Sequence, residues 1–286
     1  MKRSTLAWTF ALLSCISATV AVAATQQNVR KTAEASMLVT GSLEVNPDGT
    51  LHGYTLDHPE KLPPVVVEVI GKSIALWEFK LSASTKDVVK STMNLRVVAK
   101  PVGEGKYNVV VQGASFGQTD TNAGTVSYKD HPSPTYPRLA IDARVSGTVY
   151  LLVRVGRDGA VMDVAAEQVN LDQYGTQTDM NKYRKVLADA SIDAIRHWTY
   201  NLPTKGTAIN DPYWVVRVPV NFNLHEVGTP DKVHQYGDWN VYIPGPRQTP
   251  SWIDVGLANQ SPDATPDGSL ATGHSAVQLA TRLDGA

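Results

Sequence analysis

One short stretch of the chain has the residue types and spacing of a serine nucleophile. Gly113, Ser115 and Gly117 reproduce the pattern G-x-S-x-G in the letters GASFG. That pattern is catalytic where a strand leads into it and a helix follows, so that the serine sits on a sharp turn. The preceding letters YNVVVQ predict the strand, but the following QTDTNAGT have no helical pattern, and no histidine or acid is placed to activate the serine. We therefore expect no enzymatic activity, and we interpret the stretch as a strand that runs out into a linker.

Metal and cofactor chemistry have no better support in the sequence. The histidines are His52, His58, His131, His197, His225, His234 and His274. None of them pair at helical or zinc-finger spacing, and the single cysteine, Cys15, lies near the N-terminus. A surface loop explains His52 and His58 as readily as a metal does, and His197 beside Trp198 suits the end of a helix. No phosphate-binding or dinucleotide fingerprint occurs, so we expect no metal and no cofactor.

Length and charge narrow the class of protein further. The 286 residues suggest two domains of ordinary size. The 26 basic residues are balanced by 27 acidic ones. A nucleic acid or an anionic membrane surface attracts a clear basic excess, so we expect neither as a partner.

Residues 1–23 have the form of a secretory signal peptide. Lys2 and Arg3 give a basic start, residues 6–23 are almost wholly apolar, and the letters AVAA suit cleavage before Ala24. Cleavage removes two of the 26 basic residues and leaves 24 against 27 acidic ones. It also removes Cys15, so the exported protein has no disulfide and depends on apolar burial for stability.

Two other interpretations of the N-terminal segment stay open. About 18 apolar residues just suffice to span a bilayer as an uncleaved anchor, although small residues fill the second half of this run. The letters LLSC at residues 12–15 are also compatible with a lipoprotein signal, although the apolar run continues past the cysteine.

Two hairpin signals lie far apart in the chain. The letters LEVNPDGTL at 43–51 and VRVGRDGAV at 153–161 both place an Asp-Gly turn between apolar runs. The first half predicts strands at 37–45, 50–56, 93–99 and 107–112. The second half predicts strands at 147–155 and 161–169, a helix at 182–198 and a last strand at 214–222. Residues 64–77 fit a buried strand or a helix, because their valines favour sheets while their apolar residues recur at helical spacing.

The two halves repeat each other. Asp48-Gly49 aligns with Asp158-Gly159, and SIALWEFKL at 73–81 aligns with AIRHWTYNL at 194–202, which places Trp77 on Trp198. This indicates an internal duplication with a period of roughly 110–120 residues, far longer than a solenoid repeat. The alignment also favours a helix for the ambiguous segment, because its counterpart ends a predicted helix.

The second half resembles the C-terminal domain of TonB-type energy transducers. Three stretches carry the resemblance: PTYPRLAIDARVSGTVYLLVRVGRDGAV, ADASIDAIRHWTYNLPTKGTAI and VVRVPVNF. The residues that match the family motif are Tyr136, Pro137, Gly147, Asp158, Gly159 and Trp198. The resemblance covers residues 130–225. Residues 36–116 resemble a degenerate second copy, and residues 117–129 are interpreted as the linker.

The resemblance and the repeat imply an α+β fold of two small domains, each an antiparallel sheet with a helix packed on one face. Trp77 and Trp198 are then core anchors beneath the helix ends. Residues 226–286 contain six prolines and seven glycines and predict a mostly unstructured tail. The aromatic letters WNVYIPGPRQTPSWIDV in that tail suit either a docking segment or a segment that packs back on a domain.

Pro219 directs attention to the strand at 214–222. A proline cannot donate a ladder hydrogen bond and is confined to sheet edges or bulges, so this strand is expected at an edge, where another strand can add. The expected binding residues are Trp214, Val215, Val216, Arg217, Val218, Pro219 and Val220. Val215 and Arg217 are expected to point away from the core. The alternative is that Pro219 only protects the edge from aggregation.

The resemblance implies a periplasmic protein that binds short segments of outer-membrane TonB-dependent receptors, or of other envelope proteins, by strand addition in transport across the envelope. An inner-membrane anchored form that faces the periplasm and contacts inner-membrane motor proteins is the alternative location. The sequence departs from the family because no histidine precedes His52 and no proline-rich spacer follows the apolar segment. The alternative function is a structural or adaptor module whose two copies pack together, or which forms a homodimer.

Overall fold

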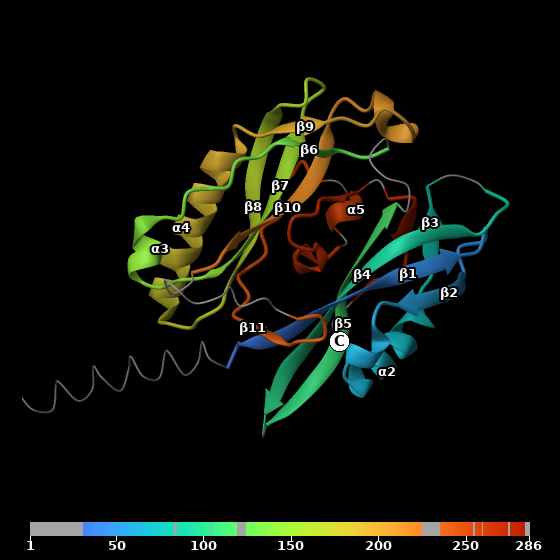
Figure 1. Ribbon diagram of the computed structural model, residues 1–286, viewed down its shortest axis with the longest axis horizontal. Coiled ribbons are helices and arrows are strands. Elements are labelled where there is room, and N and C mark those ends of the chain that lie inside the picture. Colours follow the sequence, from blue (N-terminus) through green and yellow to red (C-terminus); the bar gives the residue numbers. More distant parts are fainter. Residues whose placement is uncertain are drawn as a thin grey trace, which may run out of the picture.

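Two larger antiparallel sheets, each with a helix on one face, form the protein (Figure 1). The computed structural model describes residues 31–82, 85–103, 105–118, 124–224, 235–253, 255–258, 260–273 and 275–283. The predicted α+β class is confirmed. The predicted signal peptide lies outside the described residues, and so do His225, His234 and His274. No helix among the described residues is long and apolar enough to cross a bilayer.

The first sheet is built by the first half of the chain. Its elements are β1 (Glu34–Val45), β2 (Leu51–Leu56), α2 (Pro64–Ile74), β3 (Phe79–Leu81), β4 (Val89–Gly103) and β5 (Lys106–Gln118). The segment that fitted either strand or helix is the helix α2, which begins at a proline and buries Val66, Ile70 and Ile74 at a spacing of four residues. The GASFG letters lie inside β5, which ends directly after them at Gln118, so the strand runs further than the predicted end at residue 112.

The second sheet is built by the second half. Its elements are β6 (Ser127–Asp130), α3 (Arg138–Asp142), β7 (Gly147–Val155), β8 (Val161–Leu171), α4 (Gln177–Ile195), β9 (Thr199–Asn201) and β10 (Trp214–Phe222). The helix α4 begins five residues before the predicted start because Thr176 caps it, accepting a hydrogen bond from the Asp179 backbone N–H at 3.2 Å. It ends at Ile195, three residues before Trp198, which is 5% exposed.

The two halves share one order of strand pairing. β1 lies between β2 and β4, and β7 lies between β8 and β10. In each half the glycine of the Asp-Gly turn has a positive φ, 86° at Gly49 and 79° at Gly159. The Gly49 carbonyl accepts a 2.9 Å hydrogen bond from the Phe79 backbone N–H, and the Gly159 carbonyl accepts one of 2.9 Å from the Tyr200 backbone N–H. Phe79 and Tyr200 each lie in the short strand that follows the helix of their half. Turn, helix end and sheet are therefore fastened in the same way in both halves.

The C-terminal segment differs from the prediction. Its described residues form β11 (Asn240–Tyr242), α5 (Val255–Ala258), β12 (Ala271–Thr272) and β13 (Val277–Leu279), so the expectation of a mostly unstructured tail was wrong for them. Figure 1 shows this tail, in orange and red, passing between the two sheets while α2 and α4 lie on their outer sides. β11 pairs with β1, β12 with β10 and β13 with β3. The composition of the tail did not predict these strands, because the strands with which they pair lie far away in the sequence.

A glycine pair tests the turn that fastens the second hairpin. Gly159→Ala should destabilise the protein by more than Gly105→Ala. The two glycines have similar positive φ values, 79° and 71°, where a side chain costs about 1–2 kcal/mol. A Cβ at position 159 would in addition lie 2.5 Å from the Tyr200 carbonyl oxygen, whereas a Cβ at 105 meets nothing within 4 Å. Urea unfolding of the two variants measures the difference, and equal losses would contradict this account of the turn.

Candidate strand-binding edge

The family-motif residues position the second sheet and do not form an open site. The Tyr136 hydroxyl donates to the Val145 carbonyl at 2.5 Å, and its ring packs edge-on against Phe222 at 5.2 Å. Pro137 immediately precedes α3. A Cβ at Gly147 would collide with the Asn170 carbonyl oxygen, so only glycine fits that close strand approach.

The remaining motif residues hold the turn and the core. The Asp158 carboxylate accepts a 3.0 Å bond from the Ala160 backbone N–H and closes the Asp-Gly turn. The Trp198 indole N–H donates to the Pro132 carbonyl at 2.9 Å. These residues fix the frame that carries β10.

The inner side of β10 is fully paired. Its nine residues match β7 without interruption, from Trp214 opposite Val155 to Phe222 opposite Gly147. Pro219 lies within this ladder and has no N–H, so its nitrogen belongs on the side away from β7. Because amides alternate between the two sides of a strand, the N–H groups of Val215, Arg217 and Asn221 face outwards with it. These are the groups that an added strand would need.

The outer side of β10 is partly occupied by the protein's own tail. β12 pairs there at Val216 opposite Thr272 and at Arg217 opposite Ala271. Along residues 218–222, no described strand pairs on this side. The strand is therefore paired with the tail near its middle and unpaired on this side along 218–222, where Asn221 is exposed and the other residues are buried.

The two faces of β10 are both buried. Trp214, Val216, Val218, Val220 and Phe222 lie in the sheet-and-helix core, as the alternation predicts. Val215 and Arg217 point away from this core, as expected, but their side chains are only 4% and 0% exposed because the tail covers that face. Val215 packs in a small separate cluster beneath the tail, with Leu152, Leu257 and Ala271.

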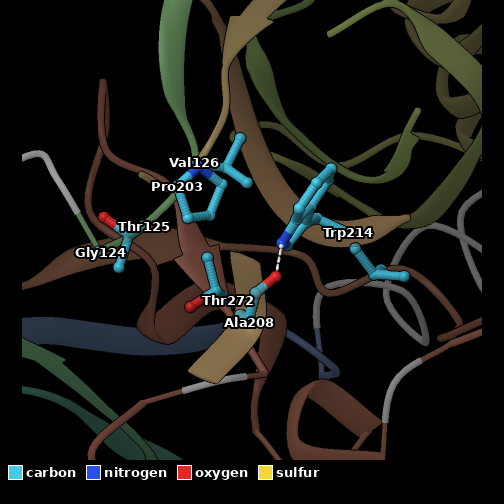
Figure 2. A pocket seen from close by; sticks show the side chains of 8 residues that line it. Gly124, Thr125, Val126, Pro203, Ala208, Trp214 and Thr272 are labelled. Carbon is cyan, nitrogen blue, oxygen red and sulfur yellow. Dashed lines mark hydrogen bonds between the residues drawn. The ribbon is translucent and has the colours of Figure 1, made fainter. Parts of the chain in front are cut away.

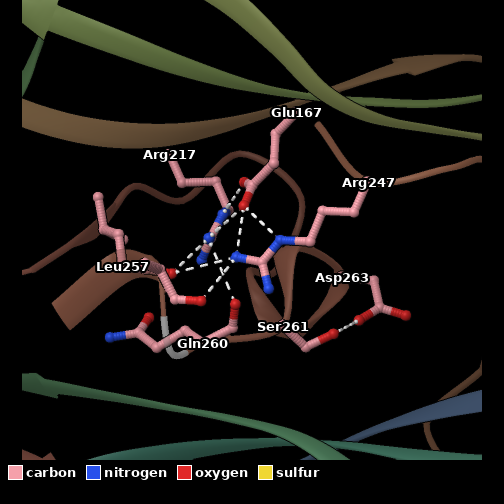
Figure 3. Close-up of polar contacts among 8 residues, drawn as sticks. Glu167, Arg217, Arg247, Leu257, Gln260, Ser261 and Asp263 are labelled. Carbon is pink, nitrogen blue, oxygen red and sulfur yellow. Dashed lines mark hydrogen bonds and ion pairs between the residues drawn. The ribbon is translucent and has the colours of Figure 1, made fainter. Parts of the chain in front are cut away.

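A buried carboxylate joins two arginines on this covered face (Figure 3). Glu167 of β8 pairs with Arg217 through two bonds of 2.6 and 2.9 Å, and with Arg247 of the tail through bonds of 2.9 and 2.6 Å. The Arg217 guanidinium also donates to the Leu257 carbonyl at 2.8 Å. The bidentate pair between Arg217 and Glu167 is of a strong and directional kind. Sequence reasoning named Arg217 but missed Glu167 and Arg247.

A second ionic contact connects the first sheet to the tail. The Nε of Arg96, on β4, donates to the Asp263 carbonyl at 2.5 Å and lies 3.6 Å from the Asp263 carboxylate. Its Nη2 donates to the Tyr150 hydroxyl on β7 at 3.5 Å. Burial opposes the charge of Arg96, but the carboxylate of Asp263 leaves its pKa raised. Burial also raises the pKa of the Tyr150 hydroxyl. The tail thus lies between the sheets with charged groups of both sheets bound to it.

A small pocket lies beside the start of β10 (Figure 2). It is lined by Gly124, Thr125, Val126, Pro203, Ala208, Trp214, Val215 and Thr272. The Trp214 indole donates to the Ala208 carbonyl at 3.0 Å and fixes one wall, and Thr272 of β12 forms another. The space holds no more than about one water molecule.

The serine and histidine side chains considered for catalysis or metal binding make only contacts within the fold. Ser115 lies within β5 with its hydroxyl donating to the Ala264 carbonyl at 3.2 Å, in a strand rather than on a strand-to-helix turn. The His52 ring contacts the Asn46 side chain at 3.0 Å. Among the described residues no three His, Cys, Asp or Glu side chains are grouped to hold a metal.

Comparison with known proteins relates part of the chain to TonB. A stretch of 104 residues, 36% of this chain, is 29% identical to Protein tonB2 of Pseudomonas aeruginosa and covers 32% of that protein. A stretch of 102 residues is 33% identical to Protein TonB of Xanthomonas campestris pv. campestris strain B100, covering 35% of this chain and 39% of that protein. No protein-family model and no solved structure matches. The chain therefore has a distant TonB-like relationship, and it spans well under half the length of these relatives.

Removing one partner of the buried ionic cluster should destabilise the protein strongly. Glu167→Leu leaves Arg217 buried without its carboxylate, and such a loss costs about 3–5 kcal/mol. The double variant Glu167→Leu with Arg217→Met should recover most of this, because an apolar pair of similar volume replaces a buried ion pair at little cost. Arg247 is one-third exposed and stays solvated.

Equilibrium urea unfolding of the single and double variants measures the recovery. Lys185→Ala is the control, because it removes an exposed pair with Asp189 and should cost less than about 1 kcal/mol. A single variant as stable as this control would contradict the importance of the cluster.

Proposed function

We propose that this chain is a TonB-like envelope protein that binds an extended segment of a partner by strand addition to the outer side of β10. The observation that carries the proposal is Pro219 in a strand fully paired with β7, because it leaves the N–H groups of Val215, Arg217 and Asn221 on the outer side. The stretch at 218–222, with which no described strand pairs on the outer side, and the distant relationship to TonB proteins support it. No catalytic step is part of the proposal.

The first half is proposed to be a degenerate second copy that no longer accepts a strand. The repeated letters and the shared order of pairing support common ancestry of residues 36–116 and 130–225. β4 occupies the place of β10 in this comparison, and its outer side is already paired with β5 from Ser91 to Gly103. The proposal therefore assigns binding to the second half alone.

The partner is proposed to be an outer-membrane TonB-dependent receptor or another envelope protein. This follows from the TonB-like relationship and from the signal-like residues 1–23, which would place the described residues in the periplasm. Contact with inner-membrane motor proteins belongs to the anchored alternative. In either location the described domains face the same compartment.

A structural adaptor is the second candidate function. It is favoured by the pairing of β12 with β10 and by the tail that binds both sheets, because these contacts occupy surface that a partner would use. An adaptor would not bind receptor peptides at β10, so the same binding experiment separates the two candidates.

Asn221→Pro should weaken peptide binding while leaving the fold intact. It removes an outward N–H beyond β12, and the Asn221 side chain is exposed. One hydrogen bond is worth about 0.5–1.5 kcal/mol, so affinity should fall roughly threefold to tenfold. Fluorescence anisotropy with labelled N-terminal segments of outer-membrane receptors measures it.

Asn221→Ala is the matched control, because it loses the same side-chain bond to Thr148 but keeps the backbone N–H. Equal affinities for the two variants would contradict strand addition at this position. Wild-type protein that binds no receptor segment at high micromolar concentration would favour the adaptor.

A further inference from the structure

We propose that residues 268–273 of the tail are a built-in occupant of the partner's place, and that a partner displaces β12 with a segment of equally small side chains. This inference rests on the proposed function and names the partner's chemistry. Its basis is that β12 lies on the outer side of β10 at Val216 and Arg217.

The backbone geometry puts β12 on the groups that strand addition requires. The Arg217 N–H faces outwards with Pro219, so Arg217 and Ala271 form the hydrogen-bonded pair of this antiparallel ladder. Val216 and Thr272 then form the adjacent pair without ladder bonds, in which the Cα atoms are closer. An incoming strand that used the Arg217 amide would compete directly with Ala271.

The side chains of β12 define which segments fit. Ala271 is 9% exposed and packs among Leu152, Val215 and Leu257. Thr272 forms a wall of the small pocket beside Trp214 (Figure 2). A replacement strand therefore takes an alanine-sized residue opposite Arg217 and a threonine-sized residue opposite Val216, since close-packed surroundings do not accept extra volume.

The contacts around β12 allow it to leave while the rest of the tail stays. The strand is two residues long, whereas the following β13 pairs with β3 at three positions and is extended by a 2.8 Å bond from the Ala280 backbone N–H to the Glu78 carbonyl. The bidentate pair of Arg217 with Glu167 does not involve β12. Displacement of β12 therefore uncovers no unpaired buried charge.

Occupation by the tail lowers the apparent affinity for a partner. If β10 can accept a partner only when β12 has left it, the apparent affinity for the partner is the intrinsic affinity multiplied by the fraction of protein in that open state. The two backbone bonds of the pair formed by Arg217 and Ala271 suggest a closed state favoured by about tenfold. Removing β12 should raise peptide affinity by a similar factor.

A reversible lock on β12 provides the test. Val216→Cys with Thr272→Cys places two thiols on a pair whose expected Cα separation, about 4.5 Å, is within disulfide range. Cys15 is the chain's own cysteine and lies in residues 1–23, so the exported full chain carries only the introduced pair. The probe is a labelled peptide with the sequence of residues 267–273, DGSLATG. We expect the oxidised protein not to bind it and the reduced protein to bind it.

Ala271→Pro in the full chain is the complementary variant, because it removes the β12 amide that pairs with Arg217. It should bind the probe about tenfold more tightly than wild type. Lys80→Pro is the control, since it places a proline at an exposed position of β3, which pairs with β13 and not with β10. Equal gains from the two prolines, or equal binding by the oxidised and reduced locks, would overturn the inference.

Two further arms separate this inference from the proposed function. A probe with tryptophan in place of Ala271 should bind Ala271→Pro protein at least tenfold more weakly than the parent probe, and equal binding would overturn the size requirement. Receptor segments that bind the oxidised lock as well as the reduced form would also overturn the inference. Receptor segments that fail on Ala271→Pro protein, while the tail probe binds, would overturn the receptor function and support β12 as the occupant.

Discussion

The unpaired backbone at the edge of a β sheet is the constraint on which this structure depends. An edge strand exposes a row of N–H and C=O groups that can pair with another strand. In the first sheet the chain covers β4 with β5 along most of its length. In the second sheet the tail covers β10 at two positions only, and Pro219 removes one donor. The two edges therefore differ: the chain itself covers most of the first, whereas it pairs with the second at two positions only.

The tail is held by charge pairs as well as by apolar contacts. Ile243 is buried in the core of the second sheet and Val277 in the core of the first. Arg217, Glu167 and Arg247 bind one another, and Arg96 binds Asp263. Buried charges are costly unless their partners are well aligned. Such contacts fix one register of the tail between the sheets, and they leave the two-residue strand β12 as a weakly attached part of it.

Local patterns in the sequence predicted the frame of the site but not its covering. The Asp-Gly turns and the core face of β10 follow from spacing and turn chemistry within a few residues, whereas α2 was favoured over a strand by the alignment of the two halves. The burial of Arg217 does not, because its partner Glu167 is fifty residues away and the covering residue Leu257 is forty away. One signal was available: VVRVPV is a nearly continuous apolar run, which is typical of a strand buried on both faces. The tail needed contacts that composition cannot reveal.

Amide hydrogen exchange of β10 tests the central claim most directly. The outward N–H groups of Val215, Arg217 and Asn221 should be measured with and without a saturating receptor segment. We predict that binding strongly slows exchange at Asn221, which lies beyond β12, and that Arg217, which is already paired with Ala271, stays protected. A bound segment that leaves exchange at Asn221 unchanged, and instead protects amides elsewhere in the protein, would contradict strand addition to β10.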